Sequence, residues 1–153
     1  MTKQYWACLQ KLVCCAVLAV CLAGCQGGKQ SAQGVDTMEL TQARWALVSL
    51  HQQPAQVYDN QPEVHLVFIE DAAGMRIAGS DGCNRLIGMA QIKGATISFG
   101  QMGTTMMACP QGQKQGQAFL QALAETQSLQ VQGNTLRLMR QGKELAVFEK
   151  RAL

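Results

Sequence analysis

Short segments in which apolar and polar residues alternate, separated by turn-forming residues, constrain the fold of this chain more than any other feature of its sequence. In one of them Val64, Leu66 and Phe68 stand two residues apart, and Glu63 and His65 flank Val64. This spacing is typical of a β-strand with one buried face, because successive side chains on a strand point to opposite sides. Similar segments recur as far as residue 149, so the sequence predicts a mainly β fold.

The alternating segments divide into about eight short strands. They are expected at residues 44–50, 63–70, 75–79, 85–92, 95–99, 129–132, 135–140 and 144–149. Gly133-Asn134 marks the clearest hairpin, because both residues tolerate the positive φ angles of a two-residue turn. So many short strands in one small domain predict a strongly curved antiparallel sheet or a barrel.

One segment departs from this pattern and is predicted to be a helix, from about residue 111 to residue 128. Pro110 precedes it and suits the first turn of a helix, where its missing N–H would be unpaired in any case. Apolar residues recur there at spacings of three and four: Phe119, Leu120, Leu123 and Ala124. This stripe is expected to pack against the sheet, so that a single amphipathic helix closes one end of the barrel.

Residues 1–24 are predicted to be a signal peptide that is removed. Lys3 and Lys11 supply its positive charge, residues 12–22 form an uninterrupted run of apolar and cysteine residues, and the first acidic residue is Asp36. An apolar run of this length is too short to cross a bilayer whose hydrocarbon core is about 30 Å thick. A cleaved peptide is therefore favoured over a permanent membrane helix.

The signal peptide leads into Leu22-Ala23-Gly24-Cys25, which resembles the lipobox of bacterial lipoproteins. The resemblance implies that Cys25 carries lipid and becomes the new N-terminus. The alternative is an ordinary secretory peptide that is cleaved nearby. Several acyl chains on one residue would anchor the protein durably in the membrane. Gln26, where an aspartate would favour the inner membrane, implies an outer-membrane lipoprotein, and we expect its domain to face the periplasm.

A flexible tether is expected from residue 25 to residue 38, because Gly, Ser and Gln dominate this stretch. The remainder, residues 39–153, is long enough for one domain, and the chain has an ordinary apolar content of 48%. Without Lys3 and Lys11 the basic residues number eleven (13 minus 2) against ten acidic ones. A nearly neutral chain with no run of Lys and Arg argues against a nucleic-acid partner.

Cys83 and Cys109 are the two cysteines inside the predicted domain. In an oxidising compartment they are expected to form a disulfide, which would close a loop of about 26 residues. An alternative keeps Cys109 as a thiolate that binds Cu(I) together with the thioethers of Met102, Met106 and Met107. The competing interpretation of these methionines is that they fill irregular gaps in the core near the disulfide.

The other candidates for chemistry have simple structural explanations. His51 and His65 stand alone, one beside a loop and one on the polar face of a predicted strand, which argues against general-base catalysis. Asp81 and Asn84 are suited to cap a turn with their side-chain oxygens. Trp45 is expected in the core, because a large aromatic side chain buries much apolar area. We assign no catalytic, metal-binding or cofactor-binding residue, and expect no cofactor.

Several motifs taken together resemble the META domain of HslJ-like bacterial lipoproteins. They are Asp81-Gly82-Cys83-Asn84-Arg85, the hairpin that ends in Ile97-Ser98-Phe99-Gly100, and Thr104-Thr105-Met106-Met107-Ala108-Cys109-Pro110 with the helix that follows. The resemblance covers roughly residues 40–148 and implies a small lipocalin-like β-barrel whose cysteines Cys83 and Cys109 are bonded. It also implies a heat-shock-associated or secreted envelope protein without assigned catalytic residues. The chain departs from the family at Met106, where an Arg or Lys is usual.

Two classes of function follow. In the first, the protein is a non-enzymatic envelope lipoprotein that binds another envelope protein or a small apolar ligand, the latter inside the barrel. In the second, it is a hydrolase or a metal-handling protein whose site converges only in three dimensions. The barrel interior discriminates between them, because converging His, Asp and Glu side chains there would favour the second class.

Overall fold

The computed structural model describes residues 34–153. The predicted signal peptide, the predicted lipid-attachment residue Cys25 and the tether as far as residue 33 lie outside the described residues. Two helices and ten strands follow one another in this order: α2 (Thr37–Thr41), β1 (Arg44–Leu50), β2 (Gln53–Pro54), β3 (His65–Asp71), β4 (Gly74–Ser80), β5 (Arg85–Lys93), β6 (Thr96–Phe99), β7 (Gly103–Thr104), α3 (Gln113–Glu125), β8 (Ser128–Gln132), β9 (Thr135–Arg140) and β10 (Lys143–Arg151). Neither helix in this part of the chain has the length and apolar character that a membrane span requires.

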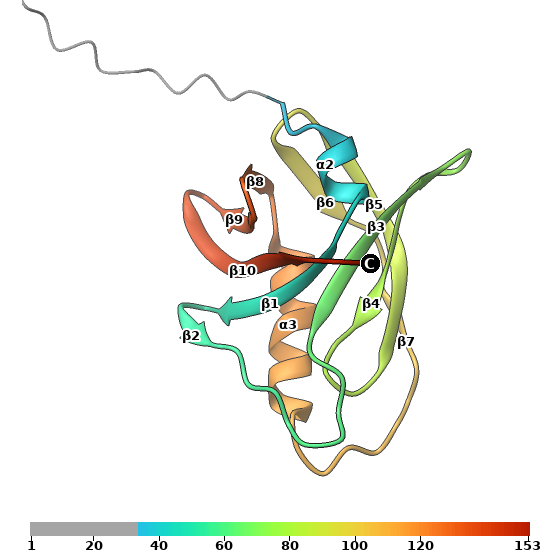
Figure 1. The fold of residues 1–153 in the computed structure, drawn as a ribbon, viewed down its shortest axis with the longest axis vertical. Coiled ribbons are helices and arrows are strands. Elements are labelled where there is room, and N and C mark those ends of the chain that lie inside the picture. Colours follow the sequence, from blue (N-terminus) through green and yellow to red (C-terminus); the bar gives the residue numbers. More distant parts are fainter. Residues whose placement is uncertain (1–33) are drawn as a thin grey trace, which may run out of the picture. The chain divides into compact units, whose positions relative to one another are not determined.

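The strands form a closed antiparallel barrel, which Figure 1 shows curving around α3. Going around the barrel, the order β1-β3-β4-β5-β6-β8-β9-β10 is also the order in the sequence, and pairing of β10 with β1 closes it. The two-residue strands β2 and β7 pair with β1 and β5 respectively. The predicted mainly β fold and lipocalin-like barrel of about eight strands are confirmed.

Alternation sets which side chains enter the barrel. On β3, Leu66 and Phe68 are buried while Val67 between them is half-buried on the outer face. The hairpin predicted at Gly133-Asn134 is confirmed, since Gln132 pairs with Thr135 and Gly133 takes a φ of 57°. The interior is filled by large apolar side chains that are fully buried: Trp45, Leu66, Phe68, Ile77, Leu86, Ile97, Leu129, Leu136 and Phe148.

Helix α3 is the predicted amphipathic helix, and its buried face completes the core. Phe119 packs edge-to-face on Phe148 of β10, with 6.1 Å between ring centroids. The fully buried residues are Gly116, Phe119, Ala122 and Leu123. The predicted stripe is therefore right for Phe119 and Leu123 and wrong for Ala124, which is exposed. The buried face of α3 is therefore narrower than the predicted stripe. Residues 116, 119 and 123 form it, and Ala122 lies beside them.

The five-residue helix α2 was not predicted. Asp36 caps it by accepting a hydrogen bond from the Met38 N–H, and the buried indole of Trp45 donates to the Leu40 carbonyl at 3.0 Å. The expected end of the tether at residue 38 therefore falls inside a helix that is fastened to β1. Trp45 lies in the core, as predicted.

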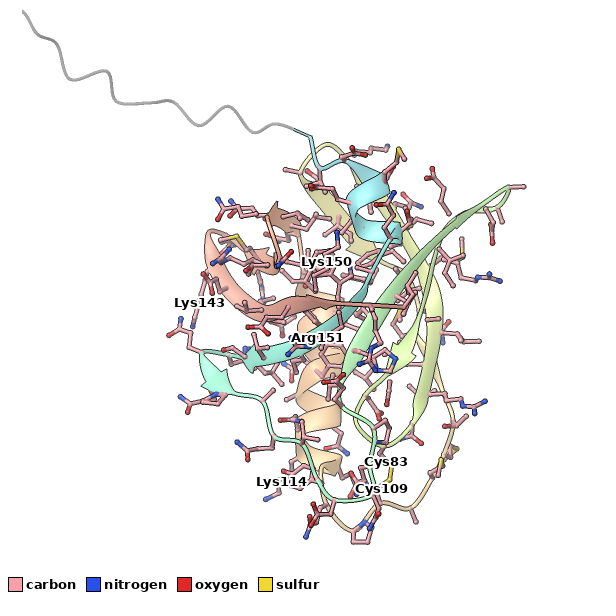
Figure 2. The ribbon with its side chains drawn as sticks, in the orientation of Figure 1. Cys83, Cys109, Lys114, Lys143, Lys150 and Arg151 are labelled. Atoms are coloured by element: carbon pink, nitrogen blue, oxygen red, sulfur yellow. A yellow bond between two sulfur atoms is a disulfide. The ribbon has the colours of Figure 1, made fainter. Side chains whose placement is uncertain are left out.

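The N-terminal end of the described chain and the two cysteines lie at opposite ends of the barrel. The Val35 N–H donates to the carbonyl of Gly94, in the turn after β5. Cys83 comes just before β5, and the nine residues of that strand span about 30 Å. Figure 2 shows Cys83 and Cys109 at the end away from α2.

Candidate functional site

A disulfide joins Cys83 to Cys109, with 6.0 Å between their Cα atoms. This Cα separation lies in the range that disulfides require. Cys83 belongs to the turn between β4 and β5, and Cys109 to the segment that leads into α3. The bond therefore connects one corner of the barrel to the start of the helix.

The carboxylate of Asp81 organises the same turn. It accepts hydrogen bonds from the backbone N–H of Cys83 at 2.8 Å, from that of Asn84, and from the Asn84 side-chain amide at 3.2 Å. Asp81 is almost completely buried, and a buried carboxylate needs such donors. The predicted turn-capping role of Asp81 is thus confirmed, and its oxygens are occupied by the protein itself.

Asn84 carries the connection across to the segment before α3. Its side-chain oxygen accepts from the backbone N–H of Met107 at 2.8 Å and from the hydroxyl of Thr105 at 3.2 Å. Thr105 also exchanges two hydrogen bonds with the backbone of Arg85, each 3.1 Å long. We name this set the clasp: Asp81, Cys83, Asn84, Thr105, Met107 and Cys109.

The clasp also fixes α3, through a close approach at Gly116. A Cβ atom at this position would lie 3.1 Å from the carbonyl oxygen of Asp81 and 3.4 Å from one of its carboxylate oxygens. Because Gly116 has no side chain, this part of α3 can pack directly against the turn that Asp81 caps.

The clasp leaves two methionine side chains in solvent. Met106 is 98% exposed and Met107 62% exposed, so the interpretation that they fill gaps in the core is wrong for both. The gap-filling interpretation is right for Met102, which packs against the core. Its sulfur atom occupies the space beside Gly88 of β5, where the strand has no side chain. Cys109 is in the disulfide, so the Cu(I) hypothesis lacks its thiolate. Among residues 34–153 no cluster of three or more His, Cys, Asp and Glu side chains could hold a metal ion.

Beside the clasp, a shallow groove of about 590 Å³ runs over the outer face of β4. Ala78 and Gly79 of β4 line it, and Val67 and Ile87 flank Ala78 on the neighbouring strands. Met107 contributes to its lining. The remaining lining residues are Pro62, His65, Ser80, Cys83, Asn84, Arg85 and Leu86. We name this feature the β4 groove.

A second hollow of about 460 Å³ lies between the clasp and the first turns of α3. Its lining includes Asp81, Gln113 and Gln117, together with Leu120, which the sequence placed in the buried stripe. The Asp81 carboxylate faces its own turn through three hydrogen bonds, so this hollow offers no free acid for catalysis.

The histidines do not form a catalytic arrangement in the described part of the chain. His51 is exposed in the turn after β1, where its backbone N–H donates to Leu145. His65 lies on β3, with its Nδ1 3.0 Å from the carbonyl oxygen of Glu63. Inside the barrel the packed side chains are apolar, so the described interior holds no convergence of His, Asp and Glu.

Sequence reasoning missed the parts of this site that depend on strand register. Ile87, on the outer face of β5, is 64% exposed, and Arg85 on the same face is also exposed. Ile87 follows the alternation of its strand, which indicates only that it faces outward. Its proximity to Met107 depends on a hydrogen bond between residues 23 positions apart, from Met107 to Asn84. No local signal could reveal that both residues line the same groove.

The barrel resembles solved structures of other proteins. An NMR structure of a protein from Burkholderia xenovorans is 25% identical, covers 75% of this chain and 86% of its own, and has a TM-score of 0.58. Another NMR structure is 23% identical, covers 75% and 94% respectively, and has a TM-score of 0.59. A crystal structure of a DUF4847 family protein from Bacteroides vulgatus is 18% identical, covers 77% and 99%, and has a TM-score of 0.52.

Likenesses at these identities show a shared fold. No curated protein matches the chain. The family model of the META domain matches residues 38–152, which include the clasp, α3 and every strand of the barrel. The chain therefore belongs to the META domain family.

Proposed function

We propose that this protein is a non-enzymatic lipoprotein of the bacterial envelope that binds another envelope protein through the clasp end of its barrel. The observation that carries the proposal is the clasp itself. A disulfide and the side chain of Asn84 hold the segment around Met106 and Met107 in place while both methionine side chains remain in solvent. Exposed apolar side chains on a fixed segment are a common feature of protein-binding surfaces.

The lipid anchor is proposed at Cys25, on the strength of the lipobox resemblance, with the outer membrane as its location and the domain facing the periplasm. The position of the N-terminal end supports this arrangement. Gly34 is the ninth residue after Cys25, and an extended chain of this length could reach about 30 Å. Gly34 and Val35 lie at the end of the barrel opposite the clasp. The tether would thus join the domain at the end away from the clasp, which leaves the clasp accessible to a partner.

A binding role fits the described side chains better than catalysis or metal handling. The buried acid Asp81 serves its own turn, and Cys109 is bonded to Cys83. A small apolar ligand inside the barrel is also disfavoured, because α3 and the large buried side chains fill the interior. The partner is therefore proposed to bind on the outside.

The anchor is tested by replacing Cys25. Cys25→Ser should abolish incorporation of radiolabelled fatty acid and should release the domain from the membrane fraction or leave an unprocessed precursor. Continued labelling of the Cys25→Ser protein would contradict the proposed attachment site.

The binding role is tested by placing a photo-crosslinking amino acid at Met106 in intact cells under heat stress. The matched control carries it at Val57, which is 65% exposed on a different loop. We expect a defined crosslinked protein from position 106 and none of the same mass from position 57. Identical products from the two positions, or none from either, would contradict a specific binding surface at the clasp.

A further inference from the structure

We infer that the β4 groove binds an extended apolar peptide segment of the partner protein that carries one carboxylate. The inference rests on the proposed function, and it adds the binding site and the chemistry of the partner. Three features of the groove support this inference. They are its shape, the presence of Arg85 without any acidic residue, and the exposed Met107 side chain in its lining.

The shape follows from the register of three neighbouring strands. Ala78 of β4 pairs with Val67 of β3 on one side and with Ile87 of β5 on the other. A small side chain between two β-branched ones leaves a trough over β4, and the lining continues to Gly79 and Ser80. The trough of about 590 Å³ is within the range of about 300–1,000 Å³ found for ligand sites. Its lining extends from these three strands to Met107, and it is a surface groove, which suits a peptide segment better than an enclosed small molecule.

The charge in the groove is of one sign. Arg85 is the only Lys or Arg residue in its lining, and none of its lining residues is acidic. The other arginines nearby on this face are already paired, Arg44 with Glu63 and Arg76 with Asp71. Arg85 has no ion-pair partner among residues 34–153.

The backbone of Arg85 is held in place, because Thr105 accepts a hydrogen bond from its N–H and donates one to its carbonyl. An unpaired arginine on a fixed backbone, in the lining of an apolar trough, favours a ligand that brings a carboxylate. This complementarity is the reason for placing one acidic group in the bound segment.

Met107 favours a peptide of variable sequence. Its side chain is 62% exposed and its backbone N–H is held by Asn84, so the flexible thioether can adjust while its attachment point stays in place. Methionine side chains adapt to apolar groups of different shape and are frequent on surfaces that bind several sequences.

The inference is tested with the purified protein and a fluorescein-labelled peptide, Ala-Leu-Val-Asp-Leu-Ala, by fluorescence polarisation. Its counterpart has Asn in place of Asp. We expect saturable binding that is about ten-fold tighter for the Asp peptide than for the Asn peptide. Arg85→Gln should remove this preference and leave the affinity for the Asn peptide unchanged, because only the ion pair is lost.

The apolar contribution is tested with two matched substitutions. Ile87→Ser, in the groove, should weaken binding of both peptides about ten-fold. Val57→Ser, at an equally exposed position outside the groove, should leave both affinities unchanged. Equal melting temperatures for the two variants would exclude unfolding as the cause of any difference between them.

Several results would overturn the inference: no saturable binding, the same affinity for the Asp and Asn peptides, equal effects of Ile87→Ser and Val57→Ser, or complete displacement of the peptide by decanoate. The last result would assign the groove to fatty acids. Each of these leaves the crosslink from position 106 untouched, so failure of the peptide chemistry can be distinguished from failure of the proposed binding function.

Discussion

Asn84 shows how one side chain can connect two distant segments. Its amide donates to Asp81 in its own turn, and its carbonyl oxygen accepts from Met107, 23 residues further along the chain. The sequence indicated a turn-capping residue, because Asp and Asn around a glycine are typical of turns. The hydrogen bond from Met107 depends on the approach of a distant segment, and no sequence pattern around Asn84 predicts it.

We predict that Asn84→Ala destabilises the domain by about 1–2 kcal/mol, because the Met107 N–H, the Thr105 hydroxyl and one Asp81 oxygen lose a partner. The control is Ser98→Ala, at an exposed position on β6. Urea denaturation of both variants measures the difference. An Asn84→Ala midpoint equal to that of the control would mean that the hydrogen bonds of the clasp contribute nothing to stability.

For Gly116 we predict an effect on stability opposite to the usual one for a glycine in a helix. Replacing a glycine inside a helix by alanine normally stabilises a protein by up to about 1 kcal/mol. Here the new Cβ would lie 3.1 Å from the carbonyl oxygen of Asp81, in a turn that its own hydrogen bonds hold in place. We therefore expect Gly116→Ala to lower the melting temperature. An increase in melting temperature would show that the turn at Asp81 can shift to accommodate the new methyl group, and that its contact with α3 is not tight.

The elements that the sequence predicted well are those whose own residues specify them. All eight longer strands lie within a few residues of their expected positions, because alternation is a property of each strand alone. Helix α2 and the two-residue strands β2 and β7 were missed, since such short pieces carry no periodicity. The β4 groove was missed for a different reason: it arises from Val67, Ala78 and Ile87 meeting across three strands.

The buried face of α3 gives the test at this scale. Leu123→Asp should destabilise the domain by several kcal/mol, because it places an unpaired charge at a fully buried position. Gln117→Asp, on the exposed face three residues after Lys114, should leave the melting temperature nearly unchanged. Similar losses of stability in both variants would mean that the helix is oriented differently.

Gln121 is also exposed but is a poorer control. Its amide donates to Glu125 at 2.8 Å, and this hydrogen bond, with a second from Arg140, lowers the pKa of Glu125. An aspartate at position 121 would remove the donor and place a second negative charge beside Glu125. A small destabilisation by Gln121→Asp would therefore say nothing about the buried face.

At the scale of the whole molecule, the disulfide connects the barrel to its helix. Cys83 and Cys109 are 26 positions apart in sequence, and closing a loop of this length corresponds to about 3–4 kcal/mol in the chain-entropy model. We expect protein purified without reductant to have no titratable thiol at these two positions. Replacing both cysteines by serine should lower the free energy of unfolding by that amount. Two reactive thiols in the folded protein would contradict the bonded state.

We propose that the clasp holds a binding surface in place. Measuring peptide affinity in the absence of the disulfide tests this role most directly. Cys83→Ser combined with Cys109→Ser is compared with the unchanged protein at a temperature where both are folded by circular dichroism. Met107 and Arg85 then keep their side chains but lose one of the bonds that hold their segment. We expect clearly weaker binding of the Asp peptide by the variant. Equal affinity of the two folded proteins would contradict it.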